Sequence, residues 1–411
     1  MPTELPRSAA SPWRGRLVAL AGLLVVALNA RIMVAVVSPI TGLINQDIPL
    51  TESHEQLIGL AAPLSFAVFG AVTPALGRRY GLEAMMIVSL LISVVGEAAR
   101  AFAPSPVWFI IWTIPALTGA GMGNVITPPL IKKYFPDRVS AVTALYTFFA
   151  TISTSLPPLT ILSLAERTGW RFSLGIWAVL GLIGVIPWLF VVFSADRAGQ
   201  RLAAIKRRLD PRTTVAAAPR LTQPLWKTPV AWALTLALAV NSLLGYTLFA
   251  WFPRVLRDAG VSTERAALYL AIFAAGSLPG TLVTPLLTAR AKRTWVLPAV
   301  FFASYAVSFT ALAVAPGSAT LAWILLSRIG DCFYPWVLTM INLRTRSTRG
   351  SIAMSGFVQP MAYAIASLGP WGFGWLHTVA GNWHVPMLAL VLFLPLQFLG
   401  GYVAGRAKPV A

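Results

Sequence analysis

The sequence predicts an all-α polytopic membrane protein in which twelve transmembrane helices form two pseudo-symmetric six-helix halves. Of the 411 residues, 57% are hydrophobic and only 11% are charged, whereas a soluble domain has about a quarter of its residues charged. Apolar runs of at least about 18 residues recur along the whole chain, and each is long enough to cross a hydrocarbon core of about 30 Å. Landmarks in the first half of the sequence also recur in the second half.

The apolar runs place twelve spans along the chain. The first resembles a secretory signal, because Arg14 and Arg16 precede an apolar stretch that reaches small residues. The run continues beyond Ala30, however, so we interpret it as a transmembrane helix. The predicted spans are 17–43, 56–76, 84–103, 107–130, 140–163, 173–194, 229–252, 266–287, 295–315, 320–342, 352–376 and 386–405.

The repeat has a nearly constant offset. Lys133 and Arg138, between the fourth and fifth spans, recur 211 residues later as Arg344 and Arg349, between the tenth and eleventh. A duplicated six-span unit explains this spacing. The predicted divisions are an N-terminal half at 1–194, a basic cytoplasmic linker at 195–227 and a C-terminal half at 228–411.

The net charge of +19 is distributed as membrane topology requires. If the N-terminus lies in the cytoplasm, 24 of the 32 lysine and arginine residues fall in cytoplasmic segments. This is the positive-inside pattern, and it argues against nucleic acid as a partner. We expect a monomeric, multi-pass protein of a bacterial inner membrane, with the lipid bilayer around it and both termini in the cytoplasm.

Arg31 lies inside the first apolar run, roughly 21 Å from the inner face at a rise of about 1.5 Å per residue. A central arginine costs about 3 kcal/mol on insertion scales, so a use for its charge is the simplest explanation. The second half carries Asn241 near the equivalent level, which means that the charge is not a requirement of the fold. We interpret Arg31 as an anion-binding residue; hydrogen bonding to carbonyls of a neighbouring helix is the structural alternative.

Arg328 and Asp331 lie three residues apart in the tenth span and therefore share one helix face. Arg328 is expected at nearly the depth of Arg31, and two guanidinium groups could bind a planar anion in a forked geometry. Three roles stay open. The two side chains can neutralise each other, Asp331 can carry a coupling proton, or Arg328 can contact the substrate.

Several motifs occur in the order typical of one transporter family. They are Asn29-Ala-Arg31 in the first span, Gly123-Asn124 to Phe135-Pro136 in the fourth span and the next loop, and Ser355-Gly356-Phe357, Gln359, Tyr363 and Leu368-Gly369-Pro370 in the eleventh. Together they resemble the cyanate/2-nitroimidazole transporter branch of the major facilitator superfamily. The resemblance implies a secondary active transporter that imports a small anion or small polar heterocycle by alternating access.

The resemblance also implies where the solute binds. In this superfamily the site lies near mid-membrane between the halves, and helices 1, 4, 7 and 10 border the central cavity. The expected substrate-binding residues are Arg31, Asn241, Arg328, Gln359, Tyr363, Asn29, Tyr146 and Asn124.

One superfamily motif is incomplete. The loop after the second span usually carries an aspartate followed by basic residues, but this chain has no aspartate there or in the repeat of that loop. Glu83 is a candidate substitute. The residues expected at the cytoplasmic gate are Gly70, Arg78, Arg79, Gly280 and Arg290.

The sequence does not favour an enzyme or a sensor. Glu97 and Asp331 are the acids within the spans, and Glu97 is expected to pair with Arg100. Neither a metal-ligand cluster nor an acid–base pair is visible, so we expect no metal and no cofactor. A multidrug or metabolite efflux pump of the same fold is the main alternative, and protons are the candidate coupling ion for symport.

Overall fold

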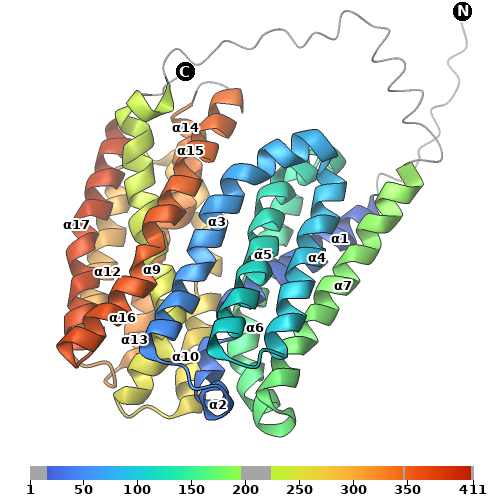
Figure 1. Ribbon diagram of the computed structural model, residues 1–411. Coiled ribbons are helices and arrows are strands. Elements are labelled where there is room, and N and C mark those ends of the chain that lie inside the picture. Colours follow the sequence, from blue (N-terminus) through green and yellow to red (C-terminus); the bar gives the residue numbers. More distant parts are fainter. Residues whose placement is uncertain (1–15, 196–223, 346–347, 409–411) are drawn as a thin grey trace, which may run out of the picture.

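The computed structural model describes residues 16–195, 224–345 and 348–408, so most of the predicted linker lies outside the described residues. The described chain is helical almost throughout (Figure 1). Its elements are α1 (Leu17–Ala35), η1 (Ser38–Ile40), α2 (Thr41–Asp47), α3 (Glu52–Tyr80), α4 (Leu82–Ala101), α5 (Pro106–Tyr134), α6 (Val139–Thr168), α7 (Trp170–Ala195), η3 (Leu225–Lys227), α9 (Pro229–Asp258), α10 (Thr263–Ala275), α11 (Leu278–Arg290), α12 (Val296–Val314), α13 (Thr320–Asp331), α14 (Phe333–Leu343), α15 (Thr348–Ala366), α16 (Leu368–Ala380) and α17 (His384–Arg406).

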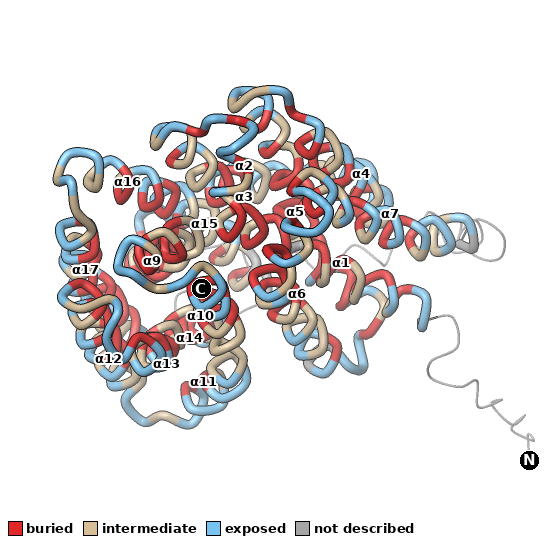
Figure 2. Tube along the Cα trace, turned by 90° about the horizontal axis from the view of Figure 1, so that it is seen from below, coloured by how far each residue is buried: buried red, intermediate tan, exposed pale blue. Residues whose placement is uncertain are grey.

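The helices form two bundles, one from α1–α7 and the other from α9–α17 (Figure 1). Viewed along the bundles, buried segments face the inside of each and exposed segments face outward (Figure 2). The bundles meet where α3 packs against α15 and α16, and where α6 packs against α10.

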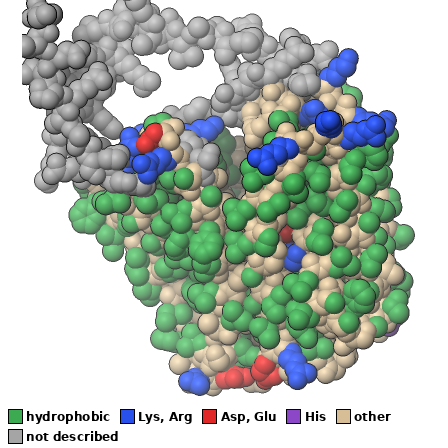
Figure 3. Space-filling model, turned by 180° about the vertical axis from the view of Figure 1, so that it is seen from behind, with side chains coloured by type: hydrophobic (Ala, Val, Ile, Leu, Met, Phe, Trp, Pro, Cys, Tyr) green, Lys and Arg blue, Asp and Glu red, His purple; other side chains and the backbone are tan. Residues whose placement is uncertain are grey.

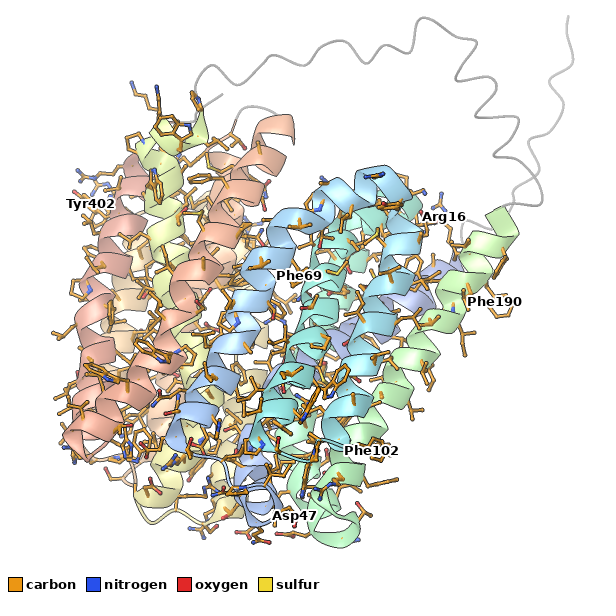
Figure 4. All side chains as sticks on the ribbon, in the orientation of Figure 1. Arg16, Asp47, Phe69, Phe102, Phe190 and Tyr402 are labelled. Atoms are coloured by element: carbon orange, nitrogen blue, oxygen red, sulfur yellow. The ribbon has the colours of Figure 1, made fainter. Side chains whose placement is uncertain are left out.

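The bundles have two ends, the linker end and the far end, which carry different residues. The linker end is the end at which α7 stops and α9 begins, and it carries Arg16 and Tyr402 (Figure 4). The far end carries Asp47 and Phe102 (Figure 4). Between them the surface is a broad apolar belt, and most charged side chains lie near the two ends (Figure 3).

The predicted all-α class and the twelve spans are confirmed. Eleven segments among the described residues are long and apolar enough to cross a membrane. The predicted span 352–376 is the twelfth. It is divided into α15 and α16 at Ser367 and is not among those eleven segments.

Four spans contain a helix break that the apolar pattern did not predict. α1, α10, α13 and α15 each end four residues before a proline. A proline has no N–H to donate to the carbonyl four residues earlier, and its ring clashes with that carbonyl. The prolines responsible are Pro39, Pro279, Pro335 and Pro370. The breaks in α10–α11 and α13–α14 lie beside the central cavity described next.

Candidate functional site

A central cavity lies between the two bundles. Its empty volume is about 1030 Å³, including the space open to solvent. Its wall comes from both halves, through α1 and α6 on one side and α9, α10, α11, α13, α14 and α15 on the other. The polar wall residues are Arg31, Thr147, Thr151, Thr154, Asn241, Ser242, Tyr246, Ser277, Thr281, Arg328, Asp331, Cys332, Tyr334 and Tyr363.

Arg31 projects into this cavity from helix α1, in which Asn29 is the other polar side chain. No carboxylate lies within ion-pairing distance of it in the part of the chain that the structure describes. Its neighbours are instead four tyrosine hydroxyls, which lie within electrostatic range of the guanidinium. They belong to Tyr146 of α6, Tyr246 of α9, Tyr334 of α14 and Tyr363 of α15.

The tyrosine rings are held by further aromatic contacts. Tyr246 and Tyr363 meet edge to face with ring centroids 6.2 Å apart. Phe66 of α3 packs edge-on against both, at 6.2 and 6.1 Å. The two Phe66 contacts cross between the halves, so the aromatic surroundings of Arg31 depend on how the two bundles pack.

Arg328 forms the ion pair with Asp331 that its sequence spacing allows. Arg328 Nη1 lies 3.3 Å from Asp331 Oδ2, and its Nε and Nη2 donate to Ser327 Oγ. The guanidinium carbon also lies 3.4 Å from the ring centroid of Phe273, a cation–π arrangement. The Arg328–Asp331 ion pair is formed. Of the two arginines in the cavity wall, Arg31 is therefore the one that has no carboxylate partner among the described residues.

Asn241 extends this polar cluster. Its amide donates to Asp331 Oδ1 at 3.2 Å, and its Oδ1 accepts a hydrogen bond from Gln397 at 3.1 Å. The Tyr305 hydroxyl lies 3.3 Å from both Asp331 Oδ1 and Asn241 Oδ1. Asp331 is therefore held by groups from two other helices, α9 and α12, and by Arg328 of its own helix α13.

Four expected substrate-binding residues lie outside the cavity wall: Asn29, Asn124, Gln359 and Tyr146, whose hydroxyl nonetheless lies within electrostatic range of Arg31. Asn29 is 2% exposed and points toward Gly181 of α7 inside the N-terminal half. Asn124 accepts a hydrogen bond from the Tyr146 hydroxyl at 2.9 Å, and Gln359 donates to Ser355 Oγ one turn earlier on α15. The amides of Asn124 and Gln359 are occupied by neighbours on the adjacent or the same helix, whereas Asn29 Oδ1 is buried without a hydrogen-bond partner among the described residues.

The structure adds wall residues that the sequence reasoning missed. Tyr246 lies one turn after Ser242 on α9, and this spacing on a helix already expected at the cavity was the available signal. Tyr334 follows a helix break that only the folded chain reveals. Thr147, Thr151 and Thr154 form a stripe at helical spacing on α6; each donates its hydroxyl to the carbonyl four residues earlier.

The residues expected at a cytoplasmic gate lie in different surroundings. Gly280 lines the central cavity and packs against the Cys332 thiol, which a Cβ at this position would approach to 2.6 Å. Arg79 lies over the ring of Tyr80 at 5.2 Å. The side chain of Arg78 lies outside the described residues, and Gly70 and Arg290 lie on α3 and α11.

Glu83 binds the end of α5. It accepts a hydrogen bond from the Tyr134 hydroxyl at 2.6 Å and forms an ion pair with Lys133. The candidate substitute for the missing aspartate therefore joins α4 to α5 within one half.

The expected ion pair between Glu97 and Arg100 is not formed. Both side chains are fully buried, but Glu97 accepts a hydrogen bond from Ser93 at 2.8 Å, and Arg100 lies 3.4 Å from the sulfur of Met33. The three-residue spacing places the two groups on one face of α4, yet packing against α1 turns the guanidinium toward Met33.

Polar contacts join the two halves at the far end. Arg254 of α9 binds Glu52 at 3.0 Å and Glu55 at 2.5 Å, both on α3. Glu52 also accepts from the Thr378 hydroxyl at 2.5 Å and lies 3.4 Å from His377 Nδ1 on α16. Ser38 donates to the carbonyl of Ala250 at 2.9 Å. We call the group Glu52, Glu55, Arg254, His377 and Thr378 the far-end latch.

Two membrane-spanning bundles around a polar central cavity are the architecture of a secondary transporter. The chain belongs to the Major Facilitator Superfamily, whose family model matches residues 22–370. It is therefore a membrane transporter of small solutes and not an enzyme.

Relatives confirm the resemblance to the cyanate/2-nitroimidazole branch. The chain is 29% identical to the 2-nitroimidazole transporter of Escherichia coli (strain K12), over 97% of this chain and 98% of that protein. It is 21% identical to the cyanate transport protein CynX of the same organism, over 92% and 96%. Among solved structures, a bacterial homolog of the human lysosomal transporter Spinster shares the fold with a TM-score of 0.72 and 16% identity, over 97% and 98% of the two chains.

Proposed function

We propose that this protein moves a small anion or a small, electron-rich polar heterocycle across the membrane by alternating access, with Arg31 as the main binding residue. The observation that carries the proposal is the position of Arg31 in the central cavity, where tyrosines surround it and no described carboxylate pairs with it. A buried cation in surroundings of low dielectric binds an anion far more strongly than it would in water.

The tyrosines support a planar solute. A guanidinium presents parallel N–H groups that match a carboxylate or a similar planar group. Tyr246, Tyr334 and Tyr363 add ring faces and hydroxyl donors to the same wall. The relatives agree with this chemistry, since their names specify cyanate, a linear anion, and 2-nitroimidazole, a planar heterocycle.

The excess positive charge of the cavity argues against the alternative of cationic drug efflux. Asp331 is bound by Arg328, so an incoming cation would have to displace a guanidinium. Asp331 is instead our candidate for the proton-coupling residue. It lines the cavity, and its carboxylate accepts hydrogen bonds from Asn241 and Tyr305 that can rearrange when a proton binds.

The test is uptake into proteoliposomes with cyanate, benzoate and 2-nitroimidazole as separate probes. Arg31→Ala is expected to reduce anion uptake by about a hundredfold, since a lost charge-assisted bidentate contact costs about 1.5–3 kcal/mol and the positive charge of the cavity is lost as well. Arg265→Ala, which removes an exposed arginine outside the cavity wall, should have wild-type uptake. Unchanged anion uptake by Arg31→Ala would contradict the proposal.

A further inference from the structure

A second cavity lies between the halves, nearer the far end. Its empty volume is about 740 Å³. Val34, Tyr246 and Phe249 line both this outer cavity and the central cavity. These three side chains therefore form a partition between two adjacent spaces on the path through the molecule.

One face of helix α9 lines both cavities. Ser242, Tyr246 and Phe249 lie at helical spacing along the central cavity, and Arg254 and Arg257 continue the same face into the outer one. Eleven residues separate Tyr246 from Arg257, which is roughly 16 Å along the helix axis. The outer cavity is thus the next position along the helix that already carries part of the Arg31 site.

The two arginines of the outer cavity differ in their partners. Arg254 is bound by Glu52 and Glu55. Arg257 has no carboxylate within 4 Å in the described part of the chain, and it reaches across to the other half, where its Nη1 lies 3.5 Å from the position of a Cβ on Gly42. The central cavity has the same composition, with Arg328 bound by Asp331 and Arg31 without a carboxylate.

The rest of the outer wall is mainly apolar, with Met33, Val37 and Leu117 among its members. It also includes Glu55, whose carboxylate is bound by Arg254 and lies within electrostatic range of Arg257. An unpaired guanidinium beside apolar walls attracts an anion more strongly than one at an open surface, because the local dielectric is lower.

We propose that the outer cavity is a second binding site for the transported anion, with Arg257 as its main ligand. The anion would occupy it between the far-end latch and the Val34–Tyr246–Phe249 partition, before or after it occupies the Arg31 site. This inference rests on the proposed function, in which the solute is an anion.

The test counts bound anions on the purified full-length protein, with radiolabelled benzoate and cyanate as separate probes. Wild type is expected to bind two anions per chain. Arg257→Gln and Arg31→Ala should each bind one, with the affinity of the remaining site changed by less than about twofold because the sites are well separated. Arg257→Lys keeps the charge and should keep two sites. Arg265→Gln is the matched control at the same end and should also bind two.

The outcomes distinguish a failure of the second binding site from a failure of the proposed transport of an anion. A wild type that binds one anion, lost only in Arg31→Ala, would overturn the second site and leave the proposed function intact. Two anions bound by Arg257→Gln would likewise overturn the role of Arg257. If neither anion binds to the wild type, both the second site and the anion proposal are wrong.

Discussion

At the residue scale, Arg31 and Arg328 look alike in the sequence, since each is an arginine inside an apolar span. The structure separates them by their partners. Arg328 is 7% exposed and is bound to Asp331, Ser327 and the face of Phe273. Arg31 faces the cavity among tyrosines. A helix places residues three apart on one face, but whether they bond depends on what else competes for each group; Glu97 and Arg100 have the same spacing and do not pair.

Replacing Asp331 by Asn tests both its structural and its coupling role. Arg328 would lose its carboxylate, and leaving a mostly buried charge with weaker partners should destabilise the protein by about 1–3 kcal/mol. We expect a lower thermal unfolding temperature and uptake that no longer responds to an imposed pH gradient. Downhill uptake of the same probe should persist, because Arg31 is untouched.

The double variant Arg328→Met/Asp331→Leu is the control for stability. It removes both charges, and replacing a buried ion pair by apolar groups of similar volume is often close to neutral. Its unfolding temperature should therefore recover toward wild type. Accumulation of solute by Asp331→Asn at the wild-type level, driven by a pH gradient, would exclude proton coupling through this residue.

At the element scale, the breaks in four spans share one feature, a proline four residues beyond the end of the helix. α1, α10, α13 and α15 stop at the carbonyl that a proline four residues later cannot bond. Two of these breaks contribute residues such as Ser277 and Cys332 to the cavity wall. Broken helices at mid-membrane are tolerated where they line a cavity. The prolines therefore help to shape the site in addition to ending the helices.

The far-end latch joins α3 to α9 and α16, and we expect it to hold the far end closed. The helices of the two bundles diverge toward the opposite, linker end (Figure 1). Partly exposed ion pairs are each worth about 0.2–1 kcal/mol. Glu52→Gln/Glu55→Gln should therefore raise the population with an open far end by several-fold. The measurement is the rate at which Cys332, the chain's single cysteine and a cavity residue, reacts with a membrane-impermeant thiol reagent added at the far-end side.

Asp47→Asn is the matched control for the latch. Asp47 pairs with Arg171 at the same end, but both belong to the N-terminal half. The indole N–H of Trp170 and the Arg171 guanidinium hold the pKa of Asp47 below its usual value, so this pair is formed at neutral pH. Breaking it should leave Cys332 labelling unchanged. Equal acceleration in both variants would mean that loosened packing, rather than the latch, controls access.

At the scale of the whole molecule, the distribution of basic residues predicts orientation. Lys and Arg concentrate in the segments that flank the linker end, and the positive-inside rule then places the linker end in the cytoplasm. Reporter fusions should show a cytoplasmic location after residue 408 and the opposite location within the loop around Asp47. A reversed pattern would invert the topology and exchange the inner and outer sides of the proposed pathway.

The sequence by itself determined the all-α class, the twelve spans and the internal repeat, and it singled out Arg31 as the candidate solute-binding residue. These follow from hydropathy, chain length and the cost of charge in a bilayer, which are local or additive properties. Tertiary packing decided which polar groups meet. It closed Arg328 on Asp331, turned Asn29 away from the cavity and brought Tyr246 and Tyr334 to Arg31 from helices distant in sequence. It also placed the outer cavity and Arg257 at the interface of the halves, because contacts across that interface depend on how two bundles pack and leave no periodic signal in either one.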